Sequence, residues 1–112
     1  MKKLFITLII SIFLIGCSNG SGIDYKKLMQ ENEYIIVDVR TREEYELGHI
    51  EKAINIPYDE LDENVDLDKD KIIFVYCKSG NRSKIAYNIL KELDYTVYNL
   101  GAFTKIDLPR EM

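Results

Sequence analysis

The chain has 112 residues, enough for one small domain, and its hydrophobic content of 46% and charged content of 30% are ordinary for a globular protein. The net charge of −4 and the scattered basic residues exclude the footprint of a nucleic-acid-binding domain, so no nucleic-acid partner is expected. Two cysteines and one histidine are too few for a Cys/His zinc site, and the sequence predicts neither a metal nor a cofactor.

The N-terminal segment is predicted to be a targeting signal. A basic start, Met1 to Lys3, precedes an almost wholly apolar run of twelve residues from Leu4 to Ile15. This run is shorter than the ~20 residues needed to span a bilayer, and it has the length of the hydrophobic region of a signal peptide. It leads into Gly16-Cys17, and the sequence Leu-Ile-Gly-Cys resembles the lipobox of bacterial lipoproteins. An ordinary secretory signal and a buried apolar helix are the alternatives.

The lipobox resemblance implies a division of the chain into three parts. Residues 1–16 would be a lipoprotein signal peptide, and residues 17–22 would be the lipidated Cys17 followed by a flexible linker rich in Gly and Ser. Residues 23–112 would form the folded domain. The resemblance also implies a diacylglyceryl group on the Cys17 sulfur and an added acyl chain such as palmitate. We therefore expect an extracytoplasmic domain, lipid-anchored to a bacterial membrane, in which Cys77 is the free thiol.

Short helical and strand patterns alternate in the first half of the folded part. Asp24 is the predicted N-cap of a helix over residues 25–31, and residues 34–39 read as a buried strand. Thr41 and Glu44 have the spacing of a capping box for a short helix that stops at Gly48.

The alternation continues to the end of the chain. Residues 53–56 are predicted to form a short strand that ends at Pro57, and residues 58–65 a short helix. Seven acidic residues lie between Asp59 and Asp70 without the pattern of an EF-hand loop, so they predict a solvated acidic surface. Strand 96–100 and a short helical turn within 101–106 complete the pattern.

The most informative stretch lies between a strand at residues 72–76 and a helix at 82–93. The helix is expected to bury one apolar face that consists of Ile85, Ala86, Ile89, Leu90 and Leu93. Cys77 would thus leave the end of a buried strand and enter a short loop before a helix. The carboxyl ends of parallel strands are where open α/β sheets bind ligands.

The loop after this strand has the residues of an anion-binding, reactive-thiol site. Its backbone N–H groups and the helix N-terminus would point inward, and Gly80 permits a sharp turn. Lys78 and Arg82 supply cations, which lower the pKa of a nearby thiol. A lone Cys77 read without this context would be a small buried hydrophobic residue. The whole stretch favours a nucleophilic thiol.

Several motifs together resemble the rhodanese-like domain family over residues 23–106. They are Asp38-Val39-Arg40, Glu44-Tyr45, Gly48-His49-Ile50, Ala53-Ile54-Asn55-Ile56-Pro57 and Cys77-Lys78-Ser79-Gly80-Asn81-Arg82-Ser83. The resemblance implies a single α/β domain with a mainly parallel central sheet and helices on both faces. His49 lies in a segment that we interpret as scaffold. Asp38, Arg40 and Glu44 have two interpretations, a charge network near the site or an ion pair that holds the turn between strand and helix, and we favour the ion pair.

The resemblance also implies sulfurtransferase activity of the thiosulfate sulfurtransferase type. Cys77 would be the catalytic nucleophile and would take a sulfane sulfur from a donor such as thiosulfate to form a persulfide. A thiophilic acceptor would then remove the sulfur. The substrate-binding residues would be Lys78, Ser79, Gly80, Asn81, Arg82 and Ser83. The implied partners are small sulfur-containing anions and thiol acceptors, together with the membrane through the lipid anchor.

Other functions remain open from the sequence. A thiol redox sensor would be helped by a second, resolving cysteine, and lipidation of Cys17 would remove the one candidate that the sequence offers. Another alternative is that the domain is a sulfur carrier without turnover, or a docking module for a membrane partner. Phosphatases and arsenate reductases of this fold are a weaker alternative, because the phosphatases place five residues between Cys and Arg. Here four residues separate Cys77 from Arg82, which resembles the sulfurtransferase form.

Overall fold

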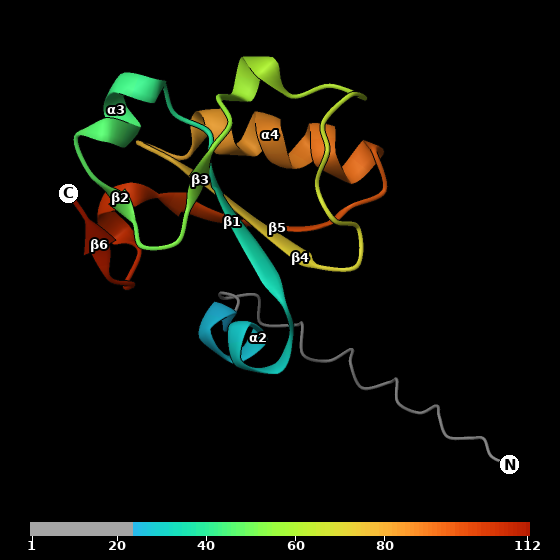
Figure 1. Ribbon diagram of the computed structural model, residues 1–112, viewed down its shortest axis with the longest axis horizontal. Helices are drawn as coiled ribbons and strands as arrows, with labels where there is room; N and C mark the ends of the chain where they lie inside the picture. Colours follow the sequence, from blue (N-terminus) through green and yellow to red (C-terminus); the bar gives the residue numbers. More distant parts are fainter. Residues whose placement is uncertain (1–23) are drawn as a thin grey trace, which may run out of the picture.

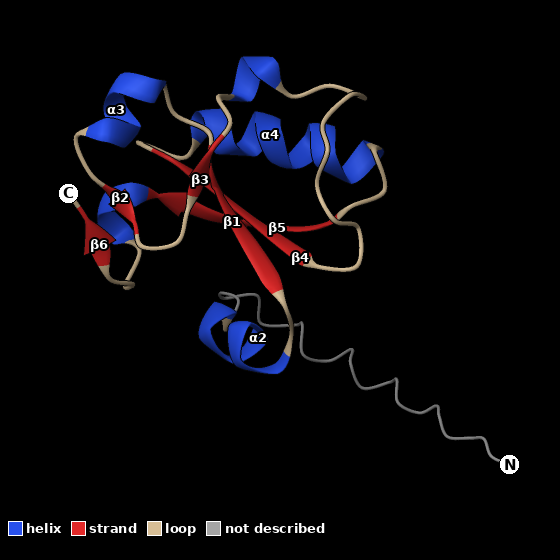
Figure 2. Ribbon diagram, viewed as in Figure 1, coloured by secondary structure: helices blue, strands red, loops and turns tan. Residues whose placement is uncertain are grey.

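The computed structural model describes residues 24–112, and its centre is a four-stranded parallel sheet with the order β3-β1-β4-β5 (Figure 2). The strands are β1 (Tyr34–Asp38), β3 (Ile54–Asn55), β4 (Ile72–Cys77) and β5 (Thr96–Ala102). Short helices connect these strands, as parallel pairing requires. The expected α/β class with a mainly parallel sheet is therefore confirmed.

Helices cover both faces of the sheet (Figure 1). The helices are α2 (Tyr25–Glu31), α3 (Arg42–Glu46) and α4 (Asn81–Glu92), and η2 (Tyr58–Glu60) and η3 (Phe103–Lys105) are single 3₁₀ turns. In Figure 1, α3 and α4 lie on one side of the strands and α2 on the other. The predicted caps are present, because the Asp24 carboxylate accepts from the backbone of Lys27, and Thr41 and Glu44 form the reciprocal capping box.

Side chains along the central strands alternate between two hydrophobic cores, one on each face of the sheet. Val37, Val75 and Cys77 face one side, where they pack with Ala86 and Leu90 of α4. The even-numbered residues Ile36, Phe74 and Tyr76 face the other side, where side chains of α2 complete the core. Because successive residues of a strand point to opposite faces, this register places the Cys77 thiol on the α4 side.

A buried ion pair fixes the end of β1. The Arg40 guanidinium lies 2.7 Å from the Asp38 carboxylate and also donates to the carbonyl of Gly48. The Tyr76 hydroxyl donates to Asp38 and accepts from the backbone N–H of Ile50. Both charges are almost fully buried, so each needs its partner. The expected ion pair at this turn is confirmed for Asp38 and Arg40.

The prediction of a helix over residues 58–65 is wrong beyond the first turn. Only η2 forms, because Leu61 is already extended. The Asp62 carboxylate then accepts a hydrogen bond from the Asn64 backbone, which closes a local turn that competes with a helix.

The predicted buried face of the helix after Cys77 also needs correction. Ile85 is 45% exposed, whereas Ser83, Ala86 and Leu90 are buried. Residues 83, 86 and 90 share one face of α4, so the buried stripe is centred on them. The prediction is thus wrong for Ile85, and Ser83, which was predicted as part of the thiol loop, also belongs to the buried stripe.

The sequence did not predict a second, two-stranded antiparallel sheet. It pairs β2 (His49–Ile50) with β6 (Arg110–Glu111). Two-residue strands carry no periodicity that could be recognised in a sequence. This sheet ties the end of the chain to the segment after α3.

Residues 1–23, with the expected signal peptide, Cys17 and the whole linker, lie outside the described residues. Within residues 24–112, no helix has both the length and the apolar character needed to cross a bilayer.

Replacing Leu90 with alanine tests the packing of α4 on the sheet. Leu90 is fully buried, so Leu90→Ala should lower the free energy of unfolding by about 2–5 kcal/mol through lost burial and a new cavity. The matched control is Leu47→Ala, since Leu47 is 78% exposed and should change stability by less than about 0.5 kcal/mol. Urea unfolding measures both. Equal effects of the two variants would contradict the described packing.

Candidate active site

The candidate site is built at the carboxyl end of the central strand β4. Cys77 is the last residue of β4, and α4 begins four residues later at Asn81. Gly80 is the N-cap residue, with a φ of 104° that side-chain-bearing residues rarely adopt. The chain therefore turns back over the thiol, which is free and buried at the start of the helix.

Three groups of the loop and helix form hydrogen bonds with the Cys77 sulfur. The backbone N–H of Gly80 donates to Sγ at 2.9 Å and that of Ser83 at 3.3 Å. The Ser83 hydroxyl oxygen lies 3.5 Å from Sγ and 3.1 Å from the Gly80 carbonyl, to which the hydroxyl donates. Rotation of this hydroxyl would let it donate to a thiolate instead. The arrangement is a cradle for a negatively charged sulfur.

Hydrogen bonding also explains the acidity of the thiol. Burial raises the pKa of Cys77. Hydrogen bonds with the Ser83 hydroxyl and with the N–H groups of Ser83, Gly80 and Ser79 lower the pKa by more than burial raises it, so the net pKa lies below the ordinary value. The sequence predicts a lowered pKa from the helix N-terminus with its loop N–H groups and from the cations of Lys78 and Arg82. The hydrogen bonds confirm the first contribution, and they are the leading causes of the lowered pKa.

Arg82 forms an ion pair with Glu44, a residue expected from the sequence to group with Asp38 and Arg40. Its two terminal nitrogens donate to Glu44 at 2.8 and 3.1 Å. This pair, with Thr41 as a second donor, lowers the pKa of Glu44 to about 2, although burial opposes the shift. The expected grouping of Glu44 with Asp38 and Arg40 is therefore wrong. Glu44 follows β1 and Arg82 follows β4, and since these strands are neighbours, the pairing could have been inferred from the strand order.

The other predicted loop residues surround the thiol at the surface. The side chains of Lys78, Ser79 and Asn81 are exposed, and Gly80 is half-buried. Within the described part of the chain, Lys78 takes part in no salt bridge. The structure thus brings Cys77 and its loop together as expected, with Lys78 as a free cation at the rim.

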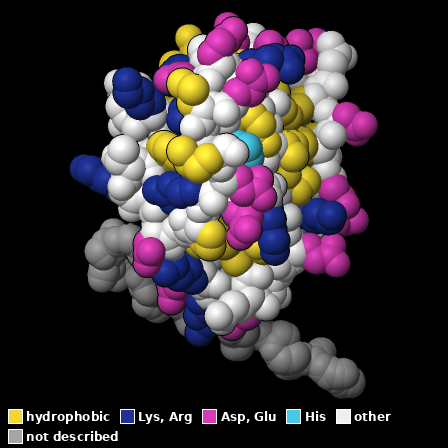
Figure 3. Space-filling model, turned by 60° about the vertical axis from the view of Figure 1, so that its left-hand side comes forward, with side chains coloured by type: hydrophobic (Ala, Val, Ile, Leu, Met, Phe, Trp, Pro, Cys, Tyr) yellow, Lys and Arg dark blue, Asp and Glu magenta, His cyan; other side chains and the backbone are white. Residues whose placement is uncertain are grey.

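His49 has a structural role. Its ring stacks on Tyr45 with 3.8 Å between centroids, Nδ1 lies 2.9 Å from the Tyr45 carbonyl, and Nε2 lies 3.1 Å from Glu111. Only 15% of its side chain is exposed, which is the small cyan area in Figure 3. These contacts support the interpretation of His49 as scaffold. Among residues 24–112, no cluster of three or more His, Cys, Asp or Glu is placed to hold a metal ion.

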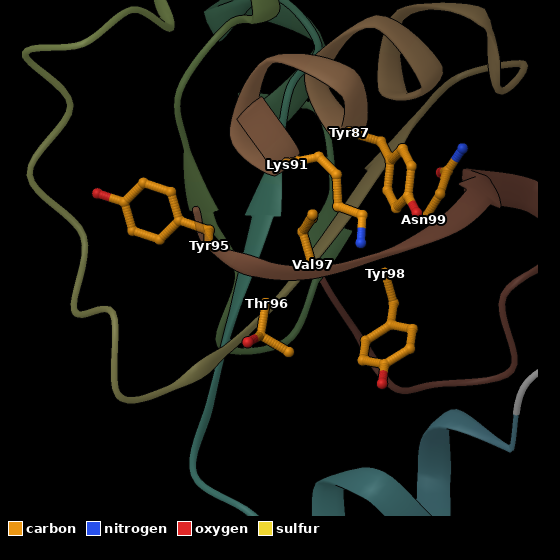
Figure 4. A pocket seen from close by; sticks show the side chains of 7 residues that line it. All are labelled: Tyr87, Lys91, Tyr95, Thr96, Val97, Tyr98 and Asn99. Atoms are coloured by element: carbon orange, nitrogen blue, oxygen red, sulfur yellow. The ribbon is translucent and has the colours of Figure 1, made fainter. Parts of the chain in front are cut away.

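A pocket of about 460 Å³ lies between α4 and the edge of β5, and its lining side chains are shown in Figure 4. They are Tyr87, Lys91, Tyr95, Thr96, Val97, Tyr98 and Asn99. The β5 residues among them lie beside Ile72–Val75, the amino-terminal part of β4, whereas Cys77 ends that strand. No residue of the thiol loop lines this pocket, so it is separate from the candidate active site.

The contribution of the Ser83 hydroxyl can be tested by titrating the thiol. Ser83→Ala removes one of the donors, and we expect the pH midpoint of alkylation of Cys77 by iodoacetamide to move upward, because the thiolate loses stabilisation. Ser79→Ala is the matched control, since it removes an exposed hydroxyl and keeps the backbone N–H. An unchanged midpoint in Ser83→Ala would show that the hydroxyl does not stabilise the thiolate.

Comparison with known proteins agrees with this architecture. The family model of the rhodanese-like domain matches residues 22–106. Thiosulfate sulfurtransferase PspE of Escherichia coli (strain K12) is 40% identical over 78 residues, which cover 66% of this chain and 75% of that protein. The solved structure of a rhodanese with anions from E. coli is 36% identical with a TM-score of 0.64, and the match covers 70% of this chain and 96% of that one.

Some relatives are much longer proteins. A probable molybdopterin-synthase adenylyltransferase of Porphyra purpurea is 43% identical over 68 residues, which are 58% of this chain and 18% of that protein. The chain thus spans less than a fifth of that relative. The match to the family model includes the loop and helix that hold the thiol as well as all four strands of the main sheet. This chain belongs to the rhodanese-like domain family.

Proposed function

We propose that this chain is a sulfurtransferase that carries sulfane sulfur as a persulfide on Cys77. The observation that carries the proposal is the buried, free Cys77 thiol whose sulfur accepts hydrogen bonds from the N–H groups of Gly80 and Ser83. Membership of the rhodanese-like domain family supports sulfur transfer as the class of chemistry. The relatives named as thiosulfate sulfurtransferases support it further.

In the first half-reaction, the Cys77 thiolate attacks the outer sulfur of the donor. With thiosulfate, the S–S bond of the donor breaks and its electron pair leaves with sulfite, while a new S–S bond forms at Cys77. The negative charge then resides on the outer sulfur of the persulfide. The loop N–H groups stand at the start of α4 and would stabilise this charge without reorganisation.

In the second half-reaction, an acceptor thiolate or cyanide attacks the outer persulfide sulfur. The Cys77–sulfur bond breaks, and Cys77 leaves as a thiolate. Because the loop lowers the pKa of this thiol, Cys77 is a good leaving group. The same hydrogen bonds that make Cys77 ionised before the reaction thus assist its release at the end.

The arrangement of Arg82 argues against the phosphatase alternative. A phosphatase arginine must bind the oxygens of the phosphoryl group, but each terminal nitrogen of Arg82 already donates to Glu44, whose charge also neutralises the guanidinium. The loop between Cys77 and Arg82 has only four residues. Both features favour a site for a smaller group, such as a single transferred sulfur.

We further propose that the mature protein is anchored through a lipid on Cys17 to a bacterial membrane, outside the cytoplasm. The support is the sequence: a basic start, an apolar run of signal-peptide length and Gly16-Cys17 at its end. Two or three acyl chains would hold the domain stably on the membrane. The persulfide chemistry would then take place at the membrane surface.

Turnover distinguishes the enzyme from a carrier or docking module. We expect the chain to convert thiosulfate and cyanide to thiocyanate over many cycles, and we expect Cys77→Ser to lose this activity to background, because serine cannot form a persulfide. Leu47→Ala is the control, since Leu47 is 78% exposed and lies outside the thiol loop. Full activity in Cys77→Ser would refute the proposal. If Cys77 takes up one sulfur atom and does not pass it to small acceptors, the result would favour the carrier.

The anchor has a separate test. Expressed in a bacterium with its own leader, the chain should partition into the membrane fraction, and its mass should match a chain that begins at Cys17 with lipid attached. Cys17→Ser should be released from the membrane fraction, while sulfur transfer by the domain is retained. A membrane-bound Cys17→Ser protein, or an unmodified mass for the parent chain, would contradict lipidation.

A further inference from the structure

The ion pair between Glu44 and Arg82 neutralises the loop arginine right beside the thiol. We propose that Glu44 is a positioning residue that tunes the site to sulfane donors of low charge, such as monoanionic thiosulfonates and organic persulfides, over the thiosulfate dianion. This inference rests on the proposed function and adds the class of donor to it. It assigns a role in specificity to a carboxylate that does not touch the sulfur.

The geometry of the pair places a carboxylate charge directly on the Arg82 guanidinium. The NH1 and NH2 atoms of Arg82 each donate to a different oxygen of Glu44, at 2.8 and 3.1 Å. Such two-point contacts are the strongest that a guanidinium makes with a carboxylate. Glu44 is itself fixed, because its carboxylate accepts from the Thr41 backbone at 2.9 Å in the capping box. An anionic donor that approaches Arg82 would therefore lie next to the negative charge of Glu44.

The remaining charges at the loop leave one uncompensated cation. Glu44 and Arg82 cancel, and Lys78 is exposed with no salt bridge in the described part of the chain. Lys84 lies two residues after Arg82 in α4, so it points to a different side of the helix. The electrostatic neighbours of Arg82 include the Cys77 thiol and Tyr58 of η2, which is neutral near pH 7. With the negative charge of the Cys77 thiolate included, these groups carry no net positive charge, which suits a singly charged donor better than a doubly charged one.

Arg82 and the thiol are close enough for their charges to interact, because the thiolate contributes to the raised pKa of Arg82. The largest contribution to that raised pKa is the hydrogen bond to Glu44. Removing the charge of Glu44 would therefore expose Cys77 and its donor to an uncompensated guanidinium. The thiolate would become more stable, and a dianion would be bound more strongly.

Two donors of the same chemistry and different charge provide the test. Thiosulfate carries two negative charges and leaves as sulfite, and benzenethiosulfonate carries one and leaves as benzenesulfinate. In both, the Cys77 thiolate forms a bond to the outer sulfur, and the electron pair of the broken S–S bond goes with the leaving group. The ratio of kcat/KM for thiosulfate to kcat/KM for benzenethiosulfonate then reports the charge preference of the site.

The variant Glu44→Gln in the full-length chain isolates the charge. Glutamine keeps an oxygen for the capping box, so the helix start is retained, and a thermal melt checks this. We expect the ratio to rise on the order of three- to tenfold, mainly through a lower KM for thiosulfate. We also expect the pH midpoint of Cys77 alkylation to move downward. If Glu44 had a purely structural role, Glu44→Gln would lower kcat/KM for both donors by the same factor and would not make the thiol more acidic.

Glu43→Gln is the matched control, because it removes a charge from the neighbouring, exposed position of α3 without freeing Arg82. The inference requires a clearly larger change in the ratio for Glu44→Gln than for Glu43→Gln. An unchanged ratio in Glu44→Gln, or equal changes in both variants, would overturn it. If the parent chain accepts sulfur from neither donor, the proposed function fails instead, so the two failures are distinguishable.

Discussion

The hydrogen bonds around the Cys77 sulfur are the interaction on which the account of this molecule depends. Burial alone would make the thiol inert, because a low-dielectric surrounding disfavours a thiolate. The N–H groups of Gly80 and Ser83 reverse this preference at 2.9 and 3.3 Å. They can do so only because β4 ends at Cys77, Gly80 turns the chain, and α4 begins directly above the sulfur. The reactive group thus depends on backbone geometry more than on neighbouring charges.

Two arginine–carboxylate pairs support that geometry in different ways. Arg40 and Asp38 are buried and bind the end of β1 to the segment at Gly48. Arg82 and Glu44 are partly exposed, with 27% and 28% of their side chains accessible, and they join α4 to α3 beside the thiol. The first pair is therefore structural. The second pair joins the two helices at the site and also sets its net charge.

The sequence predicts the parts of this structure that follow from local pattern. The four strands of the main sheet, the helix after Cys77, the Asp24 cap and the Thr41–Glu44 capping box were all recognisable from residue type and spacing. The partner of Glu44 was not, because a pairing between residues 38 positions apart depends on the strand order. The strands β2 and β6 of the small sheet were not recognisable either, because two residues alone carry no pattern. The buried stripe of α4 includes Ser83 and leaves Ile85 exposed, because the hydroxyl and the N–H of Ser83 contact the sulfur.

The most direct test of the central claim is the intact mass of the chain after exposure to thiosulfate or benzenethiosulfonate, and again after cyanide or a thiol. The account predicts the gain of one sulfur atom, mapped to the peptide that contains Cys77, and its loss to the acceptor. If iodoacetamide shows Cys77 to be free and accessible while neither donor adds sulfur, the cradle around Cys77 does not serve sulfur transfer, and the account is contradicted.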